Sequence, residues 1–231
     1  MDINNRLLDI YIRLLDRYGP QHWWPARTPF EVMIGAVLTQ STAWTNAEKA
    51  ISNLNQADAL TPAAIRALGL LELARLIYPS GFYNVKARRL MALCNYLVKA
   101  YNDDIEAMSR LQTETLQDGL LGVLGIGEET ADDILLYALC RPVFVIDAYS
   151  RRTFKRLGLA EGLISYADHQ ALFMRNLHGD VDMFGEYHAL IVHHGREACK
   201  TRPLCTTCPL LEVCPSGYIM VNGLEPYRHS G

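Results

Sequence analysis

The chain has 231 residues, of which half are hydrophobic and a fifth are charged, and its formal net charge is −3. This composition excludes a disordered chain, and the length allows one ordinary domain or two small ones. No apolar run is long enough to span a bilayer, and residues 1–6 lack the order of a signal peptide, so we expect a cytoplasmic protein with no membrane partner. The acidic balance argues against nucleic acid as a partner, but local clusters of lysine and arginine can still bind phosphates.

The hydrophobic pattern is helical almost throughout and predicts an all-α fold. A first helix is expected to end at Gly19, and Thr28 with Glu31 has the form of a capping box that opens a second. Thr42 is expected to cap a third helix, which runs to about residue 54. Later helices are expected at residues 85–101, 128–139, 148–157, 166–177 and 183–194.

The six cysteines are unevenly distributed. Cys94 and Cys140 stand alone in apolar stretches and are expected to be small core residues. The other four are crowded into residues 199–214 and are Cys199, Cys205, Cys208 and Cys214. In a cytoplasmic chain such crowding predicts a metal site rather than disulfides, and compact sites of four cysteines hold either zinc or an iron–sulfur cluster.

A turn containing Gly125 and Gly127 separates two expected helices. Two glycines around one apolar residue either make an ordinary helix–helix turn or expose backbone amides that bind a DNA phosphate at a helix N-terminus. About one helix length later, Asp147 follows the apolar residues 143–146 and precedes a helix that carries Arg151. We expect Asp147 to be the N-cap of that helix, which would fix the orientation of its carboxylate.

This order of glycine hairpin, helix, apolar residues, aspartate and basic helix resembles the helix-hairpin-helix glycosylase superfamily, which includes endonuclease III. The resemblance runs from about Phe30 to Cys214. It implies a six-helix barrel domain at 29–140, with the helix-hairpin-helix at about 115–139. A discontinuous helical domain from residues 1–28 and 141–231 would face it across a DNA-binding cleft.

The resemblance also implies a function and a set of contacts. The chain would be a DNA glycosylase of base excision repair, with Asp147 as its catalytic carboxylate. The cysteine window is similar to the family's [4Fe–4S] loop, here 199–214, although its first gap is one residue shorter than usual. In the family a wedge residue fills the gap left by the flipped nucleotide, and the hairpin and basic residues contact phosphates. The resemblance therefore implies DNA contacts from Gln40 as the wedge, and from Gly125, Gly127, Arg151, Arg196, Lys200 and Arg202.

Glu129 occupies the position at which strand-cleaving members of the family carry a lysine. That lysine forms a Schiff base with the sugar, and a carboxylate cannot form an imine. The sequence therefore predicts a monofunctional glycosylase that leaves an intact abasic site.

The tryptophan-rich segments look like the branch of the family that removes 3-methyladenine. By this resemblance the base pocket would contain Trp23, Trp24, Pro25, Trp44 and Glu129, with the base stacked between Trp24 and Trp44. An N-alkylated purine is cationic, which makes it a good leaving group and favours its contact with electron-rich indole rings. Asp147 would then stabilise an oxocarbenium-like sugar and orient the attacking water.

Several alternatives remain open at this level. The substrate could be uracil, mismatched thymine or mismatched adenine, or the chain could be an endonuclease III-like enzyme with residual activity at abasic sites. Outside enzymes, it could be a damage-sensing DNA-binding protein or a ferredoxin-like electron carrier. The expected partner is double-stranded DNA containing a damaged base, bound by a monomer that would be nucleoid-associated in a bacterium.

Overall fold

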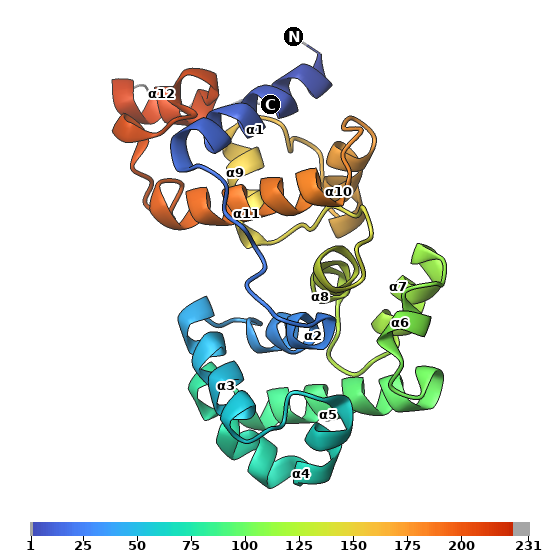
Figure 1. The fold of residues 1–231 in the computed structure, drawn as a ribbon. Helices are drawn as coiled ribbons and strands as arrows, with labels where there is room; N and C mark the ends of the chain where they lie inside the picture. The colour runs from blue at the N-terminus through green and yellow to red at the C-terminus, as the bar shows by residue number, and fades with distance from the viewer. Residues whose placement is uncertain (1, 224–231) are drawn as a thin grey trace. The chain divides into compact units, whose positions relative to one another are not determined.

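The computed structural model describes residues 2–223, and these form helices and loops without a strand, which confirms the all-α prediction (Figure 1). Internal packing divides the chain into two compact units. One unit combines Met1–Trp23 with Pro142–Gly231, and the other is Trp24–Arg141. Residue 1 and residues 224–231, which fall within the predicted discontinuous domain, lie outside the described residues. No helix in the described part of the chain is long and apolar enough to cross a membrane.

The unit Trp24–Arg141 is organised around α2 (Pro29–Leu38), which is buried along nearly its whole length because almost every residue in it is apolar. The other helices of this unit are α3 (Trp44–Gln56), α4 (Pro62–Leu76), α5 (Tyr83–Tyr101), α6 (Ile105–Met108), α7 (Thr113–Leu121) and α8 (Glu128–Asp133), with a 3-10 turn at Tyr78–Ser80. Helices α4 and α5 pack along each other, and α2 contacts α3, α5 and α8 (Figure 1).

The second unit contains α1 (Ile3–Tyr18), α9 (Ala148–Arg156), α10 (Tyr166–Met174), α11 (Val181–Glu197) and α12 (Pro215–Asn222), with 3-10 turns at Cys205–Thr207 and Leu211–Val213. Helix α11 packs against both α1 and α9. Its Tyr187 is fully buried and donates a hydrogen bond of 2.8 Å to the carbonyl of Leu7. Phe144 and Phe173 stack beside this tyrosine with ring centroids 3.7 Å apart, which completes an aromatic core.

Some local predictions were wrong. The N-cap of α3 is Ala43, and the Thr42 hydroxyl donates instead to the carbonyl of Ser80. Cys140 is exposed with φ of +53°, because the helix before it has ended and the chain is turning into a loop. The expected helix 128–139, by contrast, is present, and it changes from an α-helix at Glu128–Asp133 to a π-helix at Ile134–Ala138.

The capping box at the start of α2 is only half formed. The Thr28 hydroxyl accepts a hydrogen bond from the amide of Glu31, as expected. The Glu31 carboxylate, however, accepts from the amide of Arg27 rather than from that of Thr28. The helix start is therefore satisfied by a bond displaced by one residue.

Lys86 is a buried lysine that holds the end of α2 in place. Its side chain is almost fully inaccessible, and its ammonium donates to the Leu38 carbonyl, the Thr42 hydroxyl and the Ser80 carbonyl at 2.7–2.8 Å. Burial lowers the pKa of Lys86 to about 8, so the ammonium form still predominates at neutral pH. One cation thus satisfies the C-terminus of α2 and the 3-10 turn before α5.

Replacing Lys86 with methionine is expected to destabilise the protein. The substitution keeps most of the apolar volume but leaves the Leu38 carbonyl without its donor and removes one of the two donors to the Ser80 carbonyl, which costs about 1–3 kcal/mol in the free energy of unfolding. Urea unfolding followed by circular dichroism measures the loss. Lys99→Met on the exposed face of the same helix serves as the control and should change stability by less than about 0.5 kcal/mol. Equal stability of the two variants would show that the buried lysine is dispensable.

Candidate functional site

Asp147 is the N-cap of α9, as predicted from the sequence. Its Oδ1 accepts a hydrogen bond of 2.6 Å from the Ser150 amide and another of 2.8 Å from the Ser150 hydroxyl. The residue is only 8% exposed. The two hydrogen bonds of the cap fix the plane of the carboxylate at the start of the helix.

The second oxygen of Asp147 faces a buried histidine. Oδ2 lies 3.9 Å from Nε2 of His188, which comes from α11 and is 5% exposed. Burial lowers the pKa of His188, and the negative charge of Asp147 opposes that shift. The imidazole is therefore neutral at physiological pH.

Tyr166 fixes the chain just before the aspartate. Its hydroxyl accepts a hydrogen bond of 3.2 Å from the amide of Ile146. The guanidinium of Arg151, a predicted DNA contact, lies 5.9 Å from the centre of the Tyr166 ring. Sequence reasoning missed Ser150, Tyr166 and His188. Only Ser150, three residues after a capping aspartate, had a local signal.

Helices α9 and α11 approach closely at Gly195. A Cβ at this position would lie 2.4 Å from Cδ1 of Tyr149, so a larger residue would force the helices apart. Arg152 ties the same region together by donating to the carbonyls of Gly195 and Cys199 at 3.0 Å and 2.8 Å. The glycine between His194 and Arg196 thus sets the position of the helix that carries Asp147 at its start.

The glycine hairpin is held by side chains from other helices of its unit. Gly125 has φ of +81°, and a Cβ there would lie 2.4 Å from the side chain of Arg89. Gln40 donates to the Gly125 carbonyl at 3.0 Å and to the Thr130 hydroxyl at 2.9 Å, and Arg89 donates to the Gln40 amide oxygen. The predicted wedge residue is therefore bonded to the hairpin in this structure. Gly127 is the extended N-cap of α8.

An aromatic cluster forms around Trp24. Its ring is perpendicular to that of Trp44, with centroids 5.5 Å apart, and lies 5.4 Å from the ring of Tyr137. Gly35 makes room for it, because a Cβ there would lie 2.8 Å from the indole. The π-helix positions Tyr137, which sequence reasoning missed. Because the two tryptophan rings are perpendicular, a base can stack between them only after one ring turns.

The other predicted pocket residues are divided between the units. Pro25 and Glu129 are exposed and belong to the same unit as the aromatic cluster. Trp23 is half-buried and belongs to the other unit. Three of the predicted DNA contacts, Arg196, Lys200 and Arg202, are exposed near the cysteine loop, where they are accessible to a phosphate backbone.

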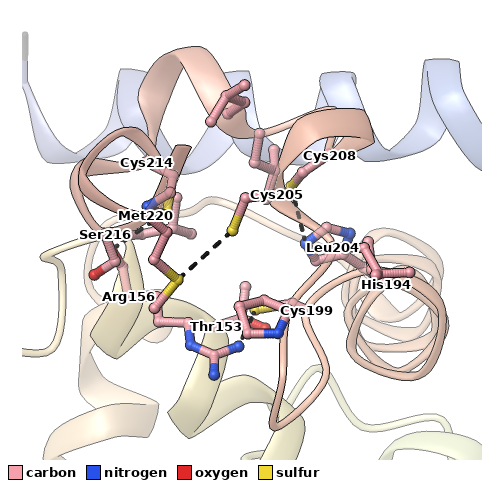
Figure 2. Close-up of a pocket in the computed structure, with 16 residues that line it drawn as sticks. Thr153, Arg156, His194, Cys199, Leu204, Cys205, Cys208, Cys214, Ser216 and Met220 are labelled. Carbon is pink, nitrogen blue, oxygen red and sulfur yellow. Dashed lines mark hydrogen bonds between the residues drawn. The ribbon is translucent and has the colours of Figure 1, made fainter. Parts of the chain in front are cut away.

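The four clustered cysteines line one cavity, and Figure 2 shows their sulfur atoms around a common space. None of the four is in a disulfide. Within residues 2–223, no group of three or more metal-ligating side chains is arranged to hold a single ion. Burial raises the pKa of Cys208 to about 11 and also raises the pKa values of Cys205 and Cys214. A multinuclear cationic centre would offset this cost, because it binds the thiolate form.

Other residues of the cavity wall suit such a centre. Arg156 donates to the sulfur of Cys199 at 3.2 Å and to the carbonyls of Lys200 and Thr201 at 2.6 Å and 3.0 Å. The Thr153 hydroxyl is buried in the wall and has no hydrogen-bond partner among the described residues. Four thiols, a cation and an unused hydroxyl donor together fit an iron–sulfur cluster.

His194 connects the cavity to α1. Its Nε2 lies 3.8 Å from the sulfur of Cys208, and its Nδ1 lies 3.0 Å from the hydroxyl of Tyr18. Burial lowers the pKa of His194 to about 4 and raises that of Tyr18 to about 12. The tyrosine hydroxyl and the neutral imidazole therefore share a hydrogen bond whose direction depends on which ring nitrogen carries the proton.

Comparisons with known proteins agree with this geometry. The family model of the HhH-GPD superfamily base excision DNA repair protein matches residues 34–178. A protein of Methanocaldococcus jannaschii that is named as a DNA repair glycosylase is 46% identical over 197 residues, which cover 84% of this chain and 89% of the relative.

Two solved structures are similar over most of the chain. Endonuclease III in a non-covalent complex with DNA is 25% identical and superposes with a TM-score of 0.81 over 96% of this chain and 100% of the other. The 3-methyladenine DNA glycosylase of Helicobacter pylori, bound to 1,N6-ethenoadenine, is 29% identical, with a TM-score of 0.71 over 85% of this chain and 98% of the other.

Replacing Gly35 with alanine is expected to displace Trp24. The new methyl group would overlap the indole, so the emission of tryptophan should shift to longer wavelength and the unfolding free energy should fall by about 1–3 kcal/mol. Fluorescence and urea unfolding measure both effects. Gly127→Ala is the matched control, because a Cβ there meets no atom within 4 Å. An unchanged emission spectrum in Gly35→Ala would contradict the packing described for the indole.

Proposed function

Because the chain belongs to the HhH-GPD superfamily of base excision DNA repair proteins and is a DNA glycosylase, we propose that it removes alkylated purines, first of all 3-methyladenine, without cutting the DNA strand. The observation that carries the substrate assignment is the cluster of Trp24, Trp44 and Tyr137. Electron-rich rings favour a cationic base over a neutral one by about 0.5–2 kcal/mol per contact. The likeness to the H. pylori enzyme supports the same substrate class.

Asp147 is proposed to act on the sugar. A 3-alkylated adenine carries a positive charge. When the N-glycosidic bond breaks, the bonding electron pair goes to the base, which therefore leaves as a neutral molecule. The ionised carboxylate stabilises the oxocarbenium-like sugar, and water then adds at C1′ while its proton passes to Asp147 or to solvent. Since Oδ1 is occupied by Ser150, Oδ2 is the oxygen available for this role.

Glu129 accounts for the proposed absence of strand cleavage. It is exposed in the first turn of α8, two residues after the second hairpin glycine. A carboxylate at this position stabilises the helix start but cannot form an imine with the abasic sugar. Hydrolysis by water is then the route that remains, and the product is an intact abasic strand.

We further propose that Cys199, Cys205, Cys208 and Cys214 hold a [4Fe–4S] cluster, as the cavity they line suits one. When bound, the cluster crosslinks four thiolates and so fixes the loop 199–214. The loop then presents its basic residues to the DNA backbone. Further contacts with double-stranded DNA would come from the hairpin amides of Gly125 and Gly127, from Gln40 and from Arg151, in a complex with one copy of the chain.

The base released from damaged DNA tests the substrate assignment. Incubation with methylated DNA is expected to release 3-methyladenine, identified by mass spectrometry, and to leave strands that are cut only after alkali treatment. Asp147→Asn should retain DNA binding and lose base release by about a factor of 10³ or more. Release of uracil, thymine or adenine from defined duplexes, with no alkylpurine from methylated DNA, would replace the proposed substrate.

The cluster has its own test. Purified protein should be brown, with broad visible absorption and four irons per chain, and Cys208→Ala should lose the colour and much of its thermal stability. Cys94→Ala is the control, because Cys94 is a buried cysteine far along the chain from the loop and should retain the iron. A colourless protein that contains one zinc per chain would contradict the assignment.

A further inference from the structure

We propose that His188 is a positioning residue for the glycosylase reaction, which it supports by holding Oδ2 of Asp147 in place while remaining uncharged. This inference rests on the proposed role of Asp147. It starts from the two oxygens of that carboxylate, which have different surroundings. Oδ1 is fixed by the backbone and side chain of Ser150, whereas Oδ2 is turned toward the imidazole from α11.

The geometry limits how the carboxylate can move. Asp147 and His188 are both buried, and Oδ2 of Asp147 lies 3.9 Å from Nε2 of His188. This distance is too long for a hydrogen bond, so the ring acts by filling the space beside Oδ2, which limits how far the carboxylate can turn about its Cβ–Cγ bond on that side. A carboxylate that is bonded at Oδ1 and limited in its movement at Oδ2 needs little reorganisation when positive charge develops on the sugar.

The charge state of His188 matters as much as its position. A protonated imidazole at this distance would pair with Asp147 and withdraw the negative charge that the sugar cation requires. Helix α11 packs against α9 and α1. On the side of α9, the charged group that acts on His188 is Asp147. On the side of α1, the Leu7 carbonyl and the Tyr11 ring contact Tyr187, the residue before His188. Burial outweighs the attraction to Asp147 and keeps the imidazole neutral.

The position of His188 in the fold is itself held firmly. The preceding Tyr187 is fully buried, and its hydroxyl is anchored on α1. Seven residues after His188, Gly195 brings α11 into close contact with Tyr149 at the start of α9. The stretch of α11 between these two contacts has little freedom to shift, so the imidazole keeps its distance from Oδ2.

A pH profile follows from this arrangement. As pH falls below the ordinary histidine value, His188 gains a proton whose positive charge offsets that of the Asp147 carboxylate, so base release by the wild type should decline. Because the folded-state pKa of His188 is lowered, this decline lies below pH of about 6.5. A residue that only filled space would not produce it.

The experiment measures single-turnover base release from pH 4.5 to 8 by the wild type, His188→Phe and His188→Gln, on a duplex holding whichever base the wild type releases. His188→Phe should be slower by about 10- to 100-fold at pH 7, as is usual when a supporting residue is removed. Its affinity for DNA should change by less than about threefold. His188→Gln supplies a neutral polar group, and should recover most of the rate at pH 7 while its acid decline moves to lower pH.

The controls separate this inference from the proposed function. His178→Gln changes an exposed histidine and should retain both the rate and the pH profile of the wild type. If the wild type releases a base other than an alkylpurine, the substrate assignment fails while the His188 test proceeds on that base. If His188→Phe does not fold, the glutamine variant decides. A glutamine variant whose pH profile superposes on that of the wild type would overturn the inference.

Discussion

The capping of α9 by Asp147 is the interaction on which the proposed chemistry depends. A buried carboxylate is costly unless its charge is compensated, and here the helix N-terminus and the two bonds from Ser150 provide that compensation. The same bonds leave one oxygen uncommitted. In the proposed mechanism Asp147 is therefore both the cap of the helix and the reactive group, and removing either role would disturb the other.

Close contacts through glycine place the elements that carry the site. Gly195 admits Tyr149 between α9 and α11, and Gly35 admits Trp24 against α2. At Gly125 the backbone itself passes beneath Arg89 in a conformation that favours glycine. In each case the glycine contributes by permitting an approach that a methyl group would prevent.

The sequence predicted the all-α class, and its Asp147 N-cap is present in the structure, because both follow from local patterns of spacing and capping. It did not predict His188 or Tyr137, which acquire their roles from helices distant in sequence. The Thr42 cap failed for a similar reason, since the same hydroxyl accepts a hydrogen bond from Lys86 and donates one to the Ser80 carbonyl. The pattern of four cysteines was visible from spacing alone, whereas the partners of Arg156 and His194 required the fold.

The π-helix at Ile134–Ala138 makes the aromatic cluster sensitive to chain length as well as to composition. A π turn holds one residue more than an α turn, so a single deletion within it would restore ordinary helical geometry. Each residue advances an α-helix by about 100° around its axis, and Tyr137 would then turn away from Trp24. Two relatives with the same aromatic residues can therefore differ in the bases they accept through one insertion or deletion, which a comparison of residue identities alone would overlook.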